Sequence, residues 1–215
     1  MTGYHGTTVE NSTKILSEGF KVLKNNKNLW LGFGVYFFLE EIYAFKWILD
    51  LYKNKNETTG FENLSKEMVI LKVNIDLKED RLLDLATYEG ELLFDKTYNI
   101  LKRSTNPKVK EMLTDKKYVA AVVINYLFEK LNVGVRYDAV KEIYRINPKN
   151  YQYILIKPQL GVPQFQICVK NLAIIKNIEI MEYKDNIAYY LKSWSELISA
   201  QPLIKIKSQR NKQYK

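Results

Sequence analysis

The sequence predicts an α+β fold in one large domain. Several short apolar runs rich in β-branched residues are typical of strands, and 68–77 is the clearest of them. Helical spacing of apolar residues follows the first two runs and also fills a long stretch, 88–132. Strands and helices do not alternate regularly, which argues against a βαβ array. For a chain of 215 residues without an evident linker, we expect one domain over 1–202, a helical insert at 87–130 and a basic tail at 203–215.

The first half of the chain is predicted from apolar spacing and from the positions of glycine. A strand ends in the turn at 4–8, and a helix over 9–20 takes Asn11 or Ser12 as its N-cap and Gly19 as its stop. The apolar run 29–38 predicts a strand that contains two glycines. A second helix is expected over 40–53, because one of its faces is apolar, formed by Ile42, Phe45, Leu49 and Tyr52.

The second half begins with a polar loop at 54–67 and the strand at 68–77. The stretch 88–132 predicts helices with a break near 104–107, where a proline interrupts the pattern. The remaining elements are expected to be strands, or a hairpin, at 136–146 and 151–156, a loop at 158–163, a strand at 164–169, extended chain at 174–183 and a helix at 186–199.

Composition excludes several classes of site. The single cysteine, Cys168, excludes a disulfide scaffold and a cysteine-based zinc module, and it is expected in the core. The single histidine, His5, excludes a His–His metal pair within the chain. Asp138 is expected in a turn or at the surface. The net charge is +9, and five of these charges lie in 203–215, which suits a nucleic-acid partner or a solubilising end.

No membrane or targeting segment is expected. The first residues lack the apolar core of a signal peptide. The longest strongly apolar run, 119–128, is well below the roughly 20 residues that a bilayer span needs. We therefore expect a cytoplasmic protein without a membrane partner.

Three local patterns carry the candidate chemistry, and each also has a plain structural explanation. His5 lies in a Tyr-His-Gly-Thr-Thr turn, although a lone histidine is commonly a surface or core residue. Gly32 and Gly34 let the backbone approach a ligand closely, or they mark a bulged strand edge. Gln164 and Gln166 share one face of a strand, which would also fit the solvated face of a sheet.

The order and spacing of these patterns are more specific than any one of them. The chain contains, in this order, His-Gly-Thr at 5–7, Ile-Leu-x-x-Gly-Phe at 15–20, Gly-x-Gly-x-Tyr-Phe at 32–37, a helix and a late strand with glutamines. This order resembles that of the ADP-ribosyltransferase superfamily. The resemblance is to its poly-ADP-ribose-polymerase-like bacterial branch, whose signature is His–Tyr–Glu, and it covers 3–47 and 162–178. It implies a split β-sandwich in which two small sheets pack face to face and NAD binds in the cleft between them.

The resemblance also implies roles for individual residues. His5 would hydrogen-bond a ribose hydroxyl of NAD, and the backbone of Gly6 would pair with the nicotinamide amide, with Thr7 beside it in the binding turn. Tyr36 would pack on the nicotinamide ring. Trp47 would cover the other side of that ring, unless it is a plain core residue. No metal is implied, because nicotinamide leaves without Lewis-acid help.

Gln166 stands where the family has its catalytic glutamate. A carboxylate there stabilises the positive charge that builds on the ribose, whereas a glutamine accepts a hydrogen bond but supplies neither charge nor base. Single transfer is therefore expected rather than chain elongation. Glu142 or Glu179 would be an alternative source of the carboxylate, although neither aligns with a motif. Gln164, two residues before Gln166, would position the acceptor.

The function that the resemblance implies is NAD-dependent mono-ADP-ribosyl transfer to a protein or nucleic acid. The protein would be a bacterial toxin or effector with NAD as its substrate, and a small antitoxin or immunity protein would be its partner. Two alternatives stay open. One is a non-catalytic module of the same fold that binds a nucleotide or a partner, and the other is a NAD glycohydrolase with water as the acceptor.

Overall fold

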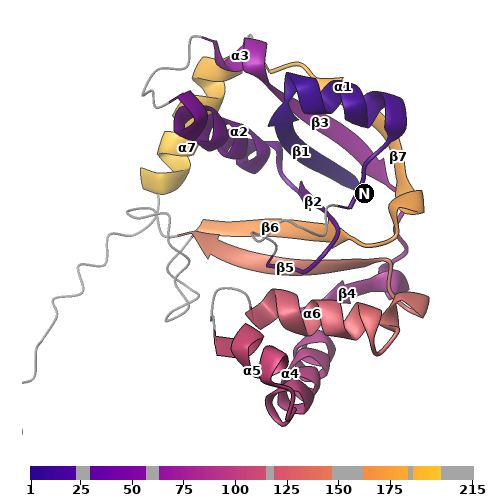
Figure 1. The fold of residues 1–215 in the computed structure, drawn as a ribbon. Helices are drawn as coiled ribbons and strands as arrows, with labels where there is room; N and C mark the ends of the chain where they lie inside the picture. Colours follow the sequence, from indigo (N-terminus) through magenta and orange to yellow (C-terminus); the bar gives the residue numbers. More distant parts are fainter. Residues whose placement is uncertain (23–29, 57–62, 115–118, 147–161, 184–185, 200–215) are drawn as a thin grey trace, which may run out of the picture.

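The structure, a computed structural model, describes residues 1–22, 30–56, 63–114, 119–146, 162–183 and 186–199 (Figure 1). Its strands are β1 (Thr2–Thr8), β2 (Val35–Phe38), β3 (Met68–Ile75), β4 (Leu82–Asp84), β5 (Ala139–Ile146), β6 (Val162–Val169) and β7 (Ile175–Met181). Its helices are α1 (Val9–Glu18), α2 (Glu41–Asn56), α3 (Leu64–Glu67), α4 (Tyr88–Lys102), α5 (Pro107–Thr114), α6 (Val119–Glu129) and α7 (Ile187–Ser199). The predicted α+β class is confirmed.

The strands form one sheet in the order β4-β5-β6-β2-β1-β3-β7. Only β4 and β5 are parallel neighbours in this order. β1 pairs with β3 along its whole length, but it pairs with β2 only at Tyr4 and Phe38. This narrow junction divides the sheet into two groups, β4-β5-β6-β2 and β1-β3-β7, which run at different angles in Figure 1.

The same face of both groups packs into one apolar cluster. Phe37 and Ile167 come from one group, and Val73 and Ile75 come from the other. Gly3 lies between them on β1, where a Cβ atom would come within 2.8 Å of Ile75 Cδ1 and 3.0 Å of Phe37 Cβ. A glycine at this position therefore lets the sheet fold on itself. The described strands form one sheet that bends at this junction, in place of the two separate sheets that the resemblance implies.

Helices cover the outer face of each group. α2 packs on β1 and β3, and α7 packs on α2, in a cluster that includes Phe45, Ile70 and Tyr190. α4 and α6 pack on β5 and β6 in a second cluster that includes Val140 and Cys168. The insert at 87–130 is therefore part of the core of the sheet, and Cys168 is fully buried as predicted. No helix among the described residues is long and apolar enough to cross a membrane.

Most predicted elements are present, and several predictions were wrong in detail. The last two residues of the predicted loop at 158–163 belong to β6. The N-cap of α1 is Thr8, whose Oγ1 accepts from the backbone N–H of Asn11 at 3.2 Å, so the helix begins before the predicted caps. The run 29–38 is a strand only from Val35, because a turn precedes it in which Gly32 has a φ of 70°. The predicted loop at 54–67 contains the end of α2 and the short helix α3. The predicted strand at 151–156 and the tail at 203–215 lie outside the described residues.

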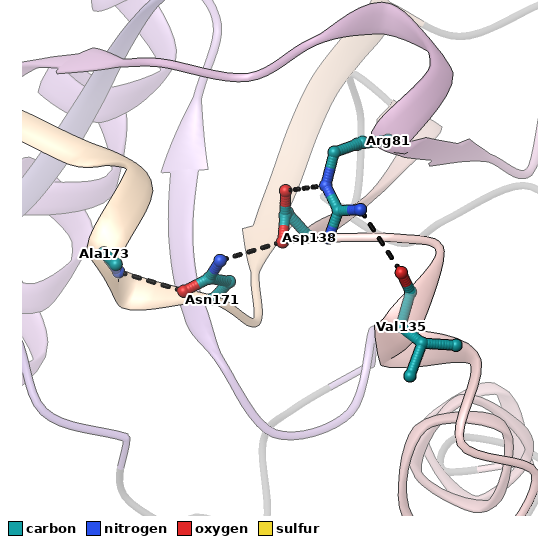
Figure 2. Close-up of polar contacts among 5 residues, drawn as sticks. All are labelled: Arg81, Val135, Asp138, Asn171 and Ala173. Atoms are coloured by element: carbon teal, nitrogen blue, oxygen red, sulfur yellow. Dashed lines mark hydrogen bonds and ion pairs between the residues drawn. The ribbon is translucent and has the colours of Figure 1, made fainter.

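Asp138 joins three parts of the chain (Figure 2), and of the two expectations, a turn or the surface, the surface position was wrong because the residue is buried in a bend. It is 5% exposed and immediately precedes β5. Its carboxylate accepts from Nε and Nη2 of Arg81 and, at 2.9 Å, from Nδ2 of Asn171. Hydrogen bonding by Arg81 lowers the pKa of Asp138, although burial opposes this. The carboxylate therefore ties the chain before β4 to the chain after β6.

Asp138→Asn is expected to destabilise the fold by about 1–3 kcal/mol at pH 7, because the variant loses the negative charge and one of the two oxygens that accept from Arg81. Since the folded pKa of Asp138 is lowered, its contribution is present above the ordinary pKa of 3.8 and is lost as the pH falls through the folded pKa. The difference between wild type and variant should thus shrink in acid. Urea unfolding from pH 3 to pH 7 would measure it, with Glu10→Gln at an exposed ion pair as the control. A pH-independent difference would contradict the assignment.

Candidate functional site

A cavity of about 610 Å³ opens beside the junction of β1 and β2. Its volume lies in the range of small-molecule binding sites. Its walls come from β1, α1, the segment 30–36, α2 and β6. The predicted site residues that line it are His5, Gly6, Thr7, Tyr36, Trp47 and Gln166. Residues far apart in the sequence are therefore brought to one cavity by the order of the strands.

His5 bridges the two strands where their backbones separate. Its Nδ1 lies 2.9 Å from the backbone oxygen of Tyr36. A carbonyl oxygen can only accept, so Nδ1 carries the proton and donates. Burial lowers the pKa of His5, so the ring is neutral at pH 7 and its Nε2 presents a lone pair. Phe20 and Phe37 pack edge-on against the imidazole and hold its orientation.

The segment 30–34 is held in place by hydrogen bonds from its own strand and from the insert. The Tyr36 hydroxyl accepts from the backbone N–H of Leu31 and donates to the oxygen of Gly32, both at 2.8 Å. Asn125 of α6 accepts from the backbone N–H of Phe33 at 2.7 Å. Lys170 Nζ donates to the oxygen of Leu31 at 2.6 Å. The insert therefore supports one wall of the cavity.

Trp47 and Gly6 form the wall on the side of α2. The Trp47 side chain is 41% exposed, which contradicts the alternative of a plain core residue. Gly6 allows α2 to approach β1 closely, since a Cβ atom there would lie 2.5 Å from Ile48 Cγ2 and 3.0 Å from Ala44 O. Past Tyr4, moreover, the edge of β1 is not paired with β2, so its backbone groups on that side are open to a ligand.

Gly6→Ala is expected to destabilise the fold by about 1–3 kcal/mol, because the methyl group would overlap α2 at Ile48 and Ala44. Displacement of α2 would also move Trp47 and so lower the affinity of the cavity for any ligand. Thermal unfolding measures the loss. Gly134→Ala is the matched control, since a Cβ atom there would meet only Phe128 at an ordinary 3.6 Å. Equal stability of the two variants would contradict the close approach of α2.

Gln166 is 4% exposed on β6, and its Oε1 accepts from Trp30 Nε1 at 3.0 Å. The indole N–H only donates, so this contact fixes the orientation of the amide: the oxygen faces Trp30, and the NH₂ group lies on the other side. The cavity therefore has an amide, and not a carboxylate, at this wall. The burial also shows that Gln166 does not lie on a solvated face of the sheet.

The other sequence candidates lie apart from the cavity lining. Gln164 shares the face of Gln166, is 6% exposed and is not among the lining residues. Glu142 of β5 lies directly opposite Gln166. Glu179 is exposed on β7, the edge strand at the far end of the sheet, and lies opposite Lys72. The sequence left open whether Glu142 or Glu179 supplies a carboxylate to the site. The strand register places Glu142, and not Glu179, beside Gln166.

Sequence reasoning missed Trp30 and the contribution of α1. Trp30 was assigned to a strand, and only its partner across the fold, Gln166, shows why an indole stands there. The end of α1 lines the cavity with Ile15 and Glu18, followed by Phe20. The motif Ile-Leu-x-x-Gly-Phe at 15–20 was the available signal, because two of these three residues belong to it.

Comparison with known proteins finds a relative, the uncharacterized protein MJ0359 of Methanocaldococcus jannaschii. The two are 33% identical over 204 residues, which cover 89% of this chain and 92% of that protein. This chain belongs to the same family as MJ0359. The family shares the domain nearly end to end rather than one motif. No protein-family profile and no solved structure matches the chain.

Proposed function

We propose that this protein is an NAD-dependent mono-ADP-ribosyltransferase with the split β-sandwich fold of that superfamily. The observation that carries the proposal is the meeting of His5, Tyr36 and Gln166 in one cavity, from β1, β2 and β6. These are the positions at which the sequence resembles the His–Tyr–Glu signature. The folded sheet, with the cavity beside its narrow junction, supports the fold assignment.

The cavity offers groups that suit NAD as a substrate. The Nε2 lone pair of neutral His5 would accept from a ribose hydroxyl, and the open edge of β1 at Gly6 and Thr7 would bind the nicotinamide amide. Tyr36 and Trp47 line the cavity from opposite elements, β2 and α2, and would cover the nicotinamide ring. The two hydrogen bonds of the Tyr36 hydroxyl hold its ring ready for this contact.

The proposed reaction breaks the bond between nicotinamide and the ribose C1′ atom. The bonding electron pair leaves with nicotinamide, which departs neutral, and the positive charge that develops on the ribose is quenched by the acceptor. Gln166 presents only an amide dipole to that charge, where the family has a carboxylate. Loss of a group that stabilises the charge of the transition state lowers rates by about 10²–10³. Slow, single transfer is therefore proposed. Gln164 would position the acceptor from its place beside Gln166.

The resemblance further supports a cytoplasmic bacterial toxin or effector, with a protein or nucleic-acid acceptor and a small antitoxin or immunity protein as partner. A second function, nucleotide binding without turnover, is favoured by a specific observation, the amide at Gln166. NAD hydrolysis with water as the acceptor is the third, and it differs from transfer only in the product.

Incubation of the full chain with NAD labelled in its adenylate phosphate separates these functions. Label on a protein of a cell lysate, or on added nucleic acid, would support transfer, while soluble ADP-ribose alone would support hydrolysis. Binding of NAD without release of nicotinamide would favour the non-catalytic module. Trp47→Ala should lose the activity, and Tyr189→Ala, an exposed aromatic residue of α7, is the matched control. Absence of NAD binding to the wild type would exclude transfer and hydrolysis.

A further inference from the structure

Glu142 stands beside Gln166 in the sheet. The antiparallel pairing of β5 with β6 places the two residues directly opposite each other. Opposed residues of such a pair point to the same face, with Cβ atoms about 5 Å apart. A carboxylate therefore lies next to the position where the resemblance leads one to expect an acid and finds an amide.

Gln164 adds an unsatisfied acceptor to the same face. It precedes Gln166 by two residues on β6 and is a diagonal neighbour of Glu142. Its side chain is more than nine-tenths buried, and its Oε1 has no hydrogen-bond partner among the described residues. A buried carbonyl oxygen without a donor is unfavourable, and a bound group that donates an N–H or O–H would satisfy it.

The surroundings of Glu142 suit a proton acceptor. Its side chain is half-buried, and one carboxylate oxygen accepts from the backbone N–H of Ile143 at 2.7 Å. Burial raises the pKa of Glu142, and the carboxylates of Asp84 on β4 and Glu91 on α4 raise it further. Lys141 forms an ion pair with Asp84, so the nearby lysine is already engaged. A carboxylate of raised pKa is a stronger base than an ordinary one.

The competing carboxylates are less well placed. Glu179 is exposed at the far edge of the sheet. Glu18 lines the cavity, but its carboxylate pairs with Lys21 at the exposed end of α1. Among the described residues, Glu142 is the acid that the register sets against Gln166.

We propose that Glu142 is the general base that activates the acceptor, and that the acceptor is an N–H or O–H donor rather than a carboxylate or a phosphate. This inference rests on the proposed function. As the C1′–nicotinamide bond breaks, the acceptor nitrogen or oxygen forms a bond to C1′, and its proton passes to the Glu142 carboxylate. A second N–H or O–H group of the acceptor molecule donates to Gln164 Oε1. An anionic acceptor would meet Glu142 with like charge and would leave Gln164 without a donor.

The test measures nicotinamide release by the full chain and its Glu142→Gln variant, with water alone, with agmatine and with acetate as the acceptor. The variant should lose about 10²- to 10⁴-fold in release rate. Its Kd for NAD should change by less than about twofold, because in the proposed complex Glu142 contacts the acceptor rather than NAD. Agmatine should accelerate release by the wild type and acetate should not. Glu179→Gln is the matched control and should behave as wild type.

The pH profile distinguishes a base from a structural role. Release by the wild type should rise with pH through the pKa of Glu142, and this rise should be absent in Glu142→Gln. Glu91→Gln removes a nearby negative charge and should shift the rise to lower pH. An unchanged rate and pH profile in Glu142→Gln, a loss of activity in Glu18→Gln instead, or acceleration by acetate but not by agmatine would overturn the inference. A wild type that binds NAD but releases no nicotinamide would also overturn it, whereas absence of NAD binding would overturn the proposed function itself.

Discussion

His5→Asn is expected to weaken NAD binding at least tenfold while preserving the fold. The asparagine Nδ2 lies as many bonds from the backbone as the imidazole Nδ1, so it can still donate to the backbone oxygen of Tyr36. The Nε2 acceptor of the cavity is lost. Loss of one hydrogen bond of about 1.4 kcal/mol corresponds to a tenfold change in Kd. Calorimetric titration with NAD would measure the change.

His5→Gln is the complementary variant, because it keeps an acceptor near the position of Nε2 and loses the bond to Tyr36. It should bind NAD more tightly than His5→Asn and unfold at a lower urea concentration. His5→Ala should show both defects. NAD binding by His5→Asn at wild-type affinity would show that the ring acts only as a bridge between the strands.

The pH dependence of stability gives an independent check on His5. Burial lowers its folded pKa below the ordinary 6.5, so the unfolded chain takes up this proton first as the pH falls. The stabilising contribution is therefore present above pH 6.5 and is lost as the pH falls from there through the folded pKa. His5→Asn should remove this part of the pH dependence. NAD affinity of the wild type should fall with protonation of the same ring.

The sequence predicted those parts of the fold that depend on local pattern. The β-branched run at 68–77 and the apolar face of the 40–53 helix became β3 and α2, because each pattern has one well-buried arrangement. The strand at 29–38 was predicted too long, because apolar content alone does not distinguish a strand from a buried turn. Gly32, with its positive φ, and the Tyr36 hydroxyl bonded back to 31–32 make that turn.

From the sequence, only those residues of the candidate site that belong to a local motif could be predicted. Six of the seven predicted residues meet in the cavity because their positions follow the strands. Trp30, Asn125 and Lys170, which support these residues, act through contacts between distant segments and have no local pattern. Glu142 lies beside Gln166 and Glu179 lies on the far edge strand. This difference likewise depends on strand register, which no local sequence pattern predicts.

Gln166→Glu is expected to increase nicotinamide release by about 10²–10³, the largest gain that a single substitution should give in this site. Glutamate has the same length, and its carboxylate can still accept from Trp30 Nε1, so the side chain keeps its position. The new charge is buried and lies near Glu142, so the variant should also be less stable at pH 7 than at pH 5. Asn74→Asp is the control, because it adds the same charge at an exposed position of β3 outside the cavity lining.

The combination of Gln166→Glu with Glu142→Gln decides whether the two positions share one task. If Glu142 supplies the carboxylate chemistry that the amide at 166 lacks, restoring the glutamate should rescue much of the activity lost in Glu142→Gln. The effects would then be non-additive, as expected for residues in contact that serve the same step. Additive effects would assign charge stabilisation and acceptor activation to separate carboxylates. No gain in release from Gln166→Glu, with NAD still bound, would instead mean that the cavity holds the nucleotide in a geometry that a carboxylate cannot exploit, and the binding module would become the better description.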